Sequence, residues 1–391
     1  MVEYDSQKSG LQIKMSEEYY NALDIEGFSR MMKDPSYCYK FYWLEAIVQL
    51  ISENKKEAAY DEIINEMIAN AWYSVLEFHV HLSGIWGDGE VKDSLEKAVL
   101  KLHKLSGLQS NASKVEIKNA IHAFDRELHK EKSTLTQNVP YKALSGFANK
   151  GLDRIDLNSS AGRMMEYYNR LNEVSRPLPY TFGDQKGLER KIIFHDSWMK
   201  MIQDNTVSIL GWIQYEKVRW LQNNNPEVPG LVYKLAPLDE KMRKLGHVRK
   251  LWEGILDITP ITDVFKDEMI RKETYDVDHF IPWSFVMNDE LWNLMPMDSS
   301  LNSAKSNKLP RWEKFFVRFA GNQYVMYEVV HEKPGIRTLY EACYRDNLHS
   351  IWASQELYRK GNSREEFLGI LEKNMRPVYD SARRQGYEVW R

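Results

Sequence analysis

Apolar residues along the first half of the chain recur every three or four positions, which is the period of an amphipathic α-helix. The clearest stripes lie in 41–51 and 63–75, and shorter ones lie in 95–102, 164–171 and 207–221. The two clear stripes are formed by Trp43, Leu44, Ile47, Leu50 and Ile51, and by Ile63, Ile64, Met67, Ile68, Ala71, Trp72 and Val75. The pattern predicts core helices throughout this half.

Two capping boxes mark where further helices begin. Ser113-x-x-Glu116 predicts a helix whose inward face is Ile117, Ile121, Phe124 and Leu128. Ser363-x-x-Glu366 predicts another that stops just before Pro377. A third helix is expected over 311–319. The segment 323–331 is rich in β-branched and aromatic residues and indicates a strand, although pattern alone does not separate a strand from a buried helix.

Two proline-containing breaks, 176–179 and 223–230, should each end a helix and are candidate boundaries. A chain of 391 residues also exceeds the roughly 250–300 residues at which a single core stops growing. We therefore expect a mainly α protein with a small α+β insert. Its expected parts are a helical N-terminal region (1–178), a helical connecting region (179–252), the insert (253–320) and a mostly helical C-terminal lobe (321–391).

Composition narrows the class of protein. Hydrophobic residues make up 43% of the chain and charged residues 28%, which is ordinary for a soluble globular protein. The first residues lack the apolar stretch of a secretory signal, so a cytoplasmic location is expected. The formal net charge of −3 means that any polyanion must be held by a local basic surface. Cys38 and Cys343 are expected to be buried thiols rather than a disulfide or part of a zinc knuckle.

The most informative segment is 275–310, where an Asp-His pair is followed by two asparagines. Residues 273–281 alternate as a short strand, so Asp278 and His279 should point to opposite faces. A carboxylate there can bind a hard divalent cation while the imidazole acts as a base toward water. Asn302, in a short helix expected over 299–307, could supply a second oxygen ligand. Singly, these residues are typical of turns and caps, and so is Asn293.

Taken together, these residues resemble the HNH, or ββα-metal, endonucleases, and most closely the HNH domain of the RNA-guided CRISPR effector nucleases. The resemblance implies that His279 is the general base and that Asp278 and Asn302 hold one Mg²⁺ or Mn²⁺. It also implies that Asn293 holds backbone and keeps the His279 ring oriented. No RuvC-like domain or guide-binding helix is recognised elsewhere, so RNA guidance is not implied. The likeness consists of Tyr275-Asp-Val-Asp-His279, Pro282, Ser284, Phe285, Asp289, Asn293, Asn302, Lys305, Ser306 and Pro310.

The same resemblance implies hydrolysis of phosphodiester bonds in DNA, with RNA as an open alternative. Basic residues near the motif form a candidate phosphate path, although each could equally belong to a solvated helix face. The expected contacts are Lys305, Lys308, Arg311, Lys314 and Arg249.

Partners and pathway follow from the resemblance only. One metal site cleaves one strand, so a homodimer is one way to cut both. The N-terminal helices could bind a small ligand or a regulatory protein, or restrain the nuclease, and a role in anti-phage defence is expected. The rival hypothesis is a nucleic-acid-binding or scaffold protein with a silent HNH unit. His79 and His81 could face one metal from a strand, but a third ligand is missing from the pattern.

Overall fold

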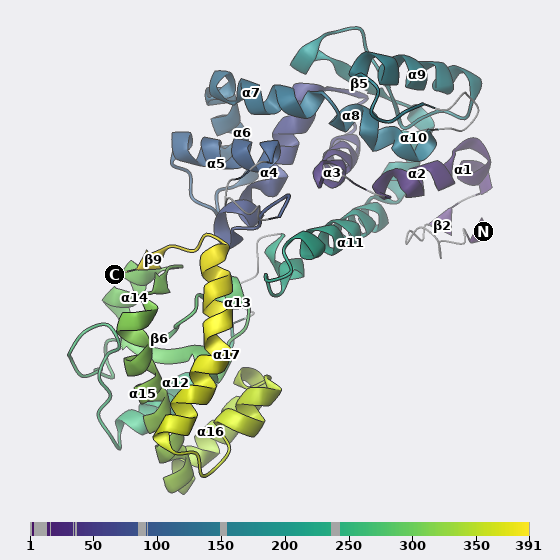
Figure 1. Cartoon of the computed structure of the whole chain (residues 1–391). Coiled ribbons are helices and arrows are strands. Elements are labelled where there is room, and N and C mark those ends of the chain that lie inside the picture. Colours follow the sequence, from purple (N-terminus) through teal and green to yellow (C-terminus); the bar gives the residue numbers. More distant parts are fainter. Residues whose placement is uncertain are drawn as a thin grey trace. The chain divides into compact units, whose positions relative to one another are not determined.

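The computed structural model describes residues 17–33, 35, 37–84, 91, 93–148, 155–235 and 243–390, with the backbone of 2–3 and 14–15 (Figure 1). The chain forms two compact units, Met1–Pro226 and Glu227–Arg391. The division falls inside the 223–230 break, whereas the 176–179 break lies within the first unit. The described chain is mainly α with small strands, which confirms the expected fold class. Among the described helices, none combines the length and apolar character needed to cross a membrane.

The first unit consists of helices around a small antiparallel sheet. The sheet has the strand order β3-β5-β4, with β3 at Glu57–Ala59, β4 at Tyr180–Phe182 and β5 at Lys191–Phe194. The helices are α1 (Glu17–Ala22), α2 (Ile25–Ser29), α3 (Tyr39–Ser52), α4 (Tyr60–Phe78), α5 (Ser94–Ser106), α6 (Lys114–Ala123), α7 (Asp125–Thr136), α8 (Val139–Lys142), α9 (Ala161–Val174), α10 (Asp196–Asp204) and α11 (Thr206–Asn224).

Helix α3 lies at the centre of the first unit and packs against α4, α10 and α11. Its Trp43 is fully buried, stands edge-on to Tyr60 of α4, and donates Nε1 to the hydroxyl of Tyr180 in β4 at 3.1 Å. The apolar stripes of 41–51 and 63–75 thus form helical core faces as the sequence predicts. Their burial removes apolar surface from water and so stabilises this unit.

One expectation for the first unit was wrong. The helix opened by Ser113 ends after Ala123, because Phe124 leaves helical geometry at φ −113° and ψ 27°, and α7 then begins as a separate helix. The capping box itself is present. His79 and His81 do not lie in a strand: His79 ends α4 in the left-handed region, and the Nδ1 atom of His81 lies 2.8 Å from Glu96 Oε1.

The second unit combines a two-stranded antiparallel sheet, β6 (Tyr275–His279) and β7 (Leu294–Asp298), with surrounding helices. Two shorter strands, β8 (Leu309–Pro310) and β9 (Val389–Trp390), pair in parallel and tie the end of the chain to the segment that follows α14. The other elements are η4 (Leu231–Lys234), α12 (Gly246–Leu256), α13 (Trp283–Val286), η6 (Leu291–Asn293), α14 (Ser299–Lys305), α15 (Trp312–Glu332), α16 (Pro334–Asn347), η7 (Ala353–Leu357) and α17 (Arg364–Arg384).

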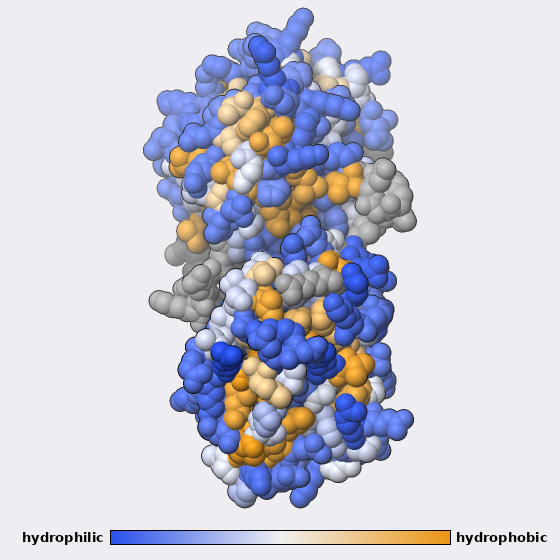
Figure 2. Space-filling model, turned by 90° about the vertical axis from the view of Figure 1, so that its left-hand side faces the viewer, coloured by the Kyte–Doolittle hydropathy of each residue, from blue (hydrophilic) through white to orange (hydrophobic). Residues whose placement is uncertain are grey.

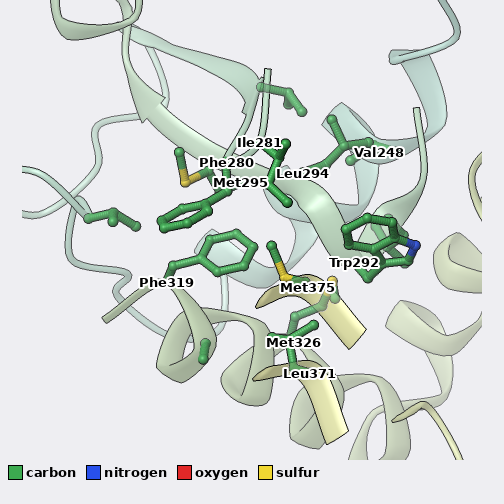
Figure 3. Close-up of a cluster of buried hydrophobic side chains, with 14 of the residues drawn as sticks. Val248, Phe280, Ile281, Trp292, Leu294, Met295, Phe319, Met326, Leu371 and Met375 are labelled. Carbon is green, nitrogen blue, oxygen red and sulfur yellow. The ribbon is translucent and has the colours of Figure 1, made fainter. Parts of the chain in front are cut away.

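The small sheet shares one hydrophobic core with the helices that follow it. Phe280, directly after β6, stacks on Phe319 of α15 with ring centroids 4.5 Å apart, and Met375 of α17 belongs to the same cluster (Figure 3). Met295 of β7 and Met326 of α15 are both fully buried there. The ββα segment is therefore held in place by long helices that lie outside it in sequence.

Two expectations for the second unit were also wrong. The segment 323–331 belongs to α15 rather than to a strand, and its buried Met326 and Val330 continue the helical stripe begun by Phe315 and Phe319. Helix α17 does not stop before Pro377 but runs through it to Arg384. The short helix predicted over 299–307 is present as α14, which ends at Lys305.

Cys38 and Cys343 are buried free thiols, and burial raises the pKa of the Cys343 thiol to about 12. Figure 2 shows that hydrophilic side chains cover most of the visible face, with apolar side chains gathered in separate patches.

Candidate active site

Strand β6 separates the side chains of the Asp-His pair. Its residues alternate in burial, with His279 buried and Asp276 and Asp278 partly exposed. Alternate residues share a face of a strand, so the two carboxylates lie on one side and the imidazole on the other. Pairing of His279 with Leu294 of β7 fixes this register. A group bound beside the end of β6 can therefore meet a carboxylate and an imidazole on consecutive residues.

The His279 imidazole is held from one side by two acceptors. Its Nε2 lies 3.1 Å from the carbonyl oxygen of Asn288 and 3.1 Å from Asp289 Oδ1. The hydrogen bond goes to the carbonyl, while the buried Asp289 Oδ1 makes no hydrogen bond and is a charge partner. Because both Nε2 neighbours are acceptors, a neutral His279 carries its proton on Nε2 and its lone pair on Nδ1. The Nδ1 atom faces Arg243 Nη2 at 3.4 Å.

The surroundings of the Asp289 carboxylate, which lies beside the His279 ring, lower its pKa. Burial raises its pKa, but the His279 imidazole, the Lys244 amide and the Arg243 guanidinium lower it by more, so the pKa lies below its usual range. The Lys244 amide donates to Asp289 Oδ2 at 2.6 Å. Asn347 of α16 donates Nδ2 to the Asp289 carbonyl oxygen at 2.8 Å. If His279 takes up a proton, a negative charge is already in place next to it.

Asn293 is fully buried in η6 and clamps the chain just after the histidine. Its Oδ1 accepts from the Ile281 amide at 2.8 Å, and its Nδ2 donates to the Ile281 carbonyl oxygen at 2.8 Å. The Phe280 amide also donates to the Asn293 carbonyl oxygen at 2.8 Å. These bonds fix the backbone that leaves β6, so Asn293 touches the backbone and not the reacting side chains.

Helix α14 presents two side chains to the carboxylate face of β6. Asp298 caps its N-terminus by accepting from the Ser300 and Leu301 amides, which sets where the first turn lies. Asn302 donates Nδ2 to Asp276 Oδ2 at 3.3 Å, and Lys305 donates Nζ to Asp278 Oδ2 at 2.8 Å. Residues three apart on a helix share a face, so Asn302 and Lys305 face the same strand.

The donor set suits a hard cation. Asp278 and Asn302 offer one carboxylate and one amide oxygen, which are ligands that Mg²⁺ and Mn²⁺ accept when water and phosphate oxygens complete the shell. Within the described part of the chain, no group of three or more His, Cys, Asp and Glu side chains could hold a metal ion. The Lys305 ammonium lies 2.8 Å from Asp278 Oδ2, so a divalent cation bound there would share this carboxylate with the lysine.

The basic residues of the expected phosphate path differ in exposure. Lys305 lies in the site itself, with a side chain only 1% exposed. Arg249 and Lys308 are 43% and 44% exposed, and they pair with Asp276 at 3.5 Å and Glu388 at 3.2 Å respectively. Arg311 and Lys314 are exposed around the start of α15. Four of the five thus remain open to solvent.

Three residues near the site received no individual role from the sequence. Asp276 anchors the Asn302 amide, Asp289 lies beside His279, and Arg243 faces the His279 lone pair and the Trp283 ring, 5.6 Å from its centroid. The alternation in Asp276-Val-Asp278 could have indicated that the first carboxylate shares the face of the second. Arg243 belongs to a basic run before the motif that the sequence offers as part of the phosphate path, but no local pattern indicates its contact with His279.

Comparison with known proteins identifies this segment. The family model of HNH endonucleases matches residues 262–311, which contain β6, β7, α14 and the Asp278, His279, Asn293 and Asn302 side chains. The resemblance of this segment to the HNH endonucleases is confirmed over residues 262–311, whereas its closer likeness to the HNH domain of the RNA-guided CRISPR effector nucleases stays a prediction. This family consists of nucleases, which act on nucleic acid and generally use a divalent metal ion. No curated protein and no solved structure matches the chain.

Proposed function

We propose that this protein is a metal-dependent endonuclease that hydrolyses phosphodiester bonds in DNA. The observation that carries the proposal is the orientation of His279. The His279 Nε2 hydrogen-bonds to the Asn288 carbonyl oxygen and lies beside Asp289. The lone pair that can accept a proton is therefore on Nδ1. An imidazole held in this way on the strand that also carries Asp278 suits general-base catalysis.

In the proposed reaction, His279 Nδ1 removes a proton from a water molecule whose oxygen forms a bond to phosphorus. The bond from phosphorus to the leaving oxygen breaks, and that oxygen is released with a proton from solvent. Asp289 stabilises the imidazolium that forms, because its carboxylate lies 3.1 Å from Nε2. Arg243 must move away from Nδ1 for water to enter, and its guanidinium is then free to contact the phosphate.

Asp278 and Asn302 would hold a divalent cation, Mg²⁺ or Mn²⁺. When bound, such an ion supplies positive charge for the pentacovalent phosphorus and the leaving oxygen. Asp276 accepts from the Asn302 Nδ2, which leaves the Asn302 Oδ1 as the atom that would bind the ion. Asn293 keeps the backbone after His279 fixed and so positions the ring.

Substrate contact is proposed for the basic residues that remain exposed, namely Arg249, Lys308, Arg311 and Lys314. They would hold phosphates without reading sequence. Cutting both strands from one site per chain would require two copies, and a homodimer is the simplest proposal. A role in anti-phage defence and a cytoplasmic location are proposed as well.

Cleavage by the full chain tests the proposal directly. Supercoiled plasmid, single-stranded DNA and labelled RNA are incubated with Mg²⁺ or Mn²⁺, and each is repeated with His279→Ala. Wild type should nick or cut DNA, and the variant should bind DNA but cleave it at least about a hundredfold more slowly. Preferential cleavage of RNA would correct the substrate.

His331→Ala is a matched control. The Nε2 atom of His331 in α15 also faces a carbonyl oxygen, that of Tyr358, at 3.2 Å, but His331 lies outside the HNH segment. This variant should cleave like wild type. If wild type binds DNA but leaves every substrate intact with either metal, the rival hypothesis of a silent HNH unit replaces the proposal. Equal cleavage by wild type and His279→Ala would remove His279 from the mechanism.

A further inference from the structure

The first unit contains a polar pocket that the nuclease site does not use. It has a volume of about 320 Å³ and lies where the start of α3, the start of α5, the end of α7 and α8 meet. Small-molecule sites typically have volumes of about 300–1,000 Å³. The pocket therefore fits a ligand the size of a mononucleotide, and a long chain would extend out of it.

One wall of the pocket is a fixed pair of aromatic rings. Tyr37 and Tyr39 stack with their centroids 5.4 Å apart and their planes 16° apart. The Tyr39 hydroxyl accepts from the Ser94 amide at 2.9 Å, which holds the inner ring in place. Tyr37 is 49% exposed, so one part of its ring remains open. A planar ring from a ligand can extend such a stack, and base–tyrosine stacking does not depend on which base is present.

The charged groups of the pocket have one sign. Its described lining contains Lys40 and Lys142 and no aspartate or glutamate. Lys40 donates Nζ to Ser145 Oγ at 2.7 Å, so its ammonium is directed by a second lining residue. Two carboxylates lie beside the lining: Asp93 is buried behind Tyr39 and is engaged by Ser83 and the first amides of α5, and the exposed Asp156 accepts from the amide of the lining residue Asn158 at 2.9 Å. The pocket is therefore suited to a small anion.

Neutral polar groups complete the lining. Gln137 and Asn138 directly precede α8, line the pocket and are exposed. Carboxamides and hydroxyls of this kind can hydrogen-bond the edge of a base or the hydroxyls of a sugar. An open aromatic ring, two lysines and neutral polar groups within one cavity match the three parts of a nucleotide.

We infer that this pocket binds a nucleoside phosphate, with the base against Tyr37 and the phosphate at Lys40 and Lys142. The inference does not depend on the proposed nuclease activity, because every residue that carries it lies in the first unit. A free nucleotide and the 5′-phosphorylated end of a nucleic acid share this chemistry. The size of the cavity favours the free nucleotide.

Calorimetric titration of the full chain tests the inference. The probes are AMP, adenosine, inorganic phosphate and a 5′-phosphorylated DNA oligonucleotide. AMP should bind to the wild-type protein. Adenosine, which lacks the phosphate, and inorganic phosphate, which lacks the nucleoside, should each bind at least about tenfold more weakly. Tyr37→Ala and Lys142→Gln should each weaken AMP binding by about tenfold or more.

Two surface substitutions in the same unit serve as controls. Tyr215→Ala removes a 59% exposed tyrosine from α11, and Lys130→Gln removes an exposed lysine from α7. Both should bind AMP like wild type. Absence of AMP binding at millimolar concentration overturns the inference, and so does equal binding of AMP and inorganic phosphate. It is also overturned if only the oligonucleotide binds, or if Tyr37→Ala and Lys142→Gln bind AMP as tightly as wild type.

Discussion

The Lys305 ammonium lies 2.8 Å from Asp278 Oδ2, and the Lys305 side chain is almost completely buried. A carboxylate proposed to hold a metal ion is therefore already balanced by a cation from the same protein. The lysine comes from α14, the helix that also carries Asn302. A buried pair of this kind adds little net stability, but loss of one partner leaves the other charge uncompensated. Lys305 thus neutralises the charge of Asp278 in the absence of substrate.

Replacement of this lysine should expose the charge of Asp278. Lys305→Met removes the cation and keeps the volume, so we expect the free energy of unfolding to fall by about 2–4 kcal/mol in the absence of metal. Mn²⁺ should then stabilise the variant more than it stabilises wild type, because the ion replaces the missing charge. Thermal unfolding with and without Mn²⁺ measures both effects. Lys305→Arg is the control and should lose less stability. If Mn²⁺ raises the Tm of Lys305→Met no more than that of wild type, the proposed place of the cation is wrong.

Loss of the Asn293 carboxamide should affect both folding and cleavage. Asn293→Ala leaves the Ile281 amide and carbonyl unpaired in a buried position, at a cost of about 2–4 kcal/mol. Asn362→Ala removes a comparable pair of bonds, from Nδ2 to the Glu356 and Leu357 carbonyl oxygens, far from the motif in sequence. Urea unfolding should show similar losses for both variants.

Cleavage should separate the two asparagine variants at a temperature where both remain folded. Asn293→Ala should cut DNA at least about tenfold more slowly because the His279 backbone is no longer fixed, whereas Asn362→Ala should cut like wild type. Equal cleavage by the two variants would assign Asn293 to stability alone.

The lowered pKa of Asp289 predicts how the free energy of unfolding changes at acidic pH. A carboxyl with a lowered folded-state pKa contributes stability that is present above its ordinary pKa of about 4 and is lost as pH falls through the lower value. Asp289→Asn should remove that contribution, so its stability should fall less steeply than that of wild type below about pH 4. Urea unfolding between about pH 3 and pH 6 gives the two slopes. Equal slopes for wild type and Asp289→Asn would contradict this contribution.

The same substitution should slow cleavage at neutral pH. Asp289→Asn leaves no negative charge beside the imidazolium that His279 forms, so turnover should fall about tenfold or more while DNA binding is retained. Single-turnover cleavage with excess enzyme separates these effects. Wild-type turnover in Asp289→Asn would show that this carboxylate serves only to hold Lys244 and the neighbouring loop.

The motif residues and the helix stripes could be predicted because each depends on local spacing. Asp278 and His279 are consecutive, and β6 alone puts their side chains on opposite faces. The capping boxes at Ser113 and Ser363 are equally local, and both form as predicted. The family match over 262–311 rests on the same short segment. Such features need no knowledge of how distant elements pack.

The missed features depend on contacts between distant segments. Arg243 reaches His279 from outside the motif, and Lys305 is buried only because α14 packs on β6. The segment 323–331 has the composition of a strand, yet it is helical because its buried residues continue the apolar face of α15. Propensity is a weak prior that tertiary packing overrides. Prediction therefore succeeded for local geometry and failed where burial decided the outcome.

Lys234 provides a second pH-dependent prediction, in the alkaline range. Burial lowers its pKa to about 7 from 10.5, and its ammonium donates to the Phe285 carbonyl oxygen at 2.5 Å. The unfolded chain therefore binds more protons than the folded protein between these values, so stability should rise with pH across this window. Lys234→Met should flatten that rise by up to about 3 kcal/mol between about pH 7 and pH 9.5. Wild type and variant with parallel stability curves would show that Lys234 stays charged in the folded protein.

Pro377 lies inside α17, where a proline lacks the amide hydrogen that would bond to the carbonyl four residues earlier. The helix continues because Leu371, Met375 and Tyr379 are buried on one face and hold both sides of the proline in register. Pro377→Ala should restore the hydrogen bond and raise the free energy of unfolding by about 1–3 kcal/mol. Pro334→Ala is the control, because Pro334 occupies the first turn of α16, where proline is favourable. Urea unfolding should show no gain for this control, and no gain for Pro377→Ala either would mean that α17 already bends to relieve the proline.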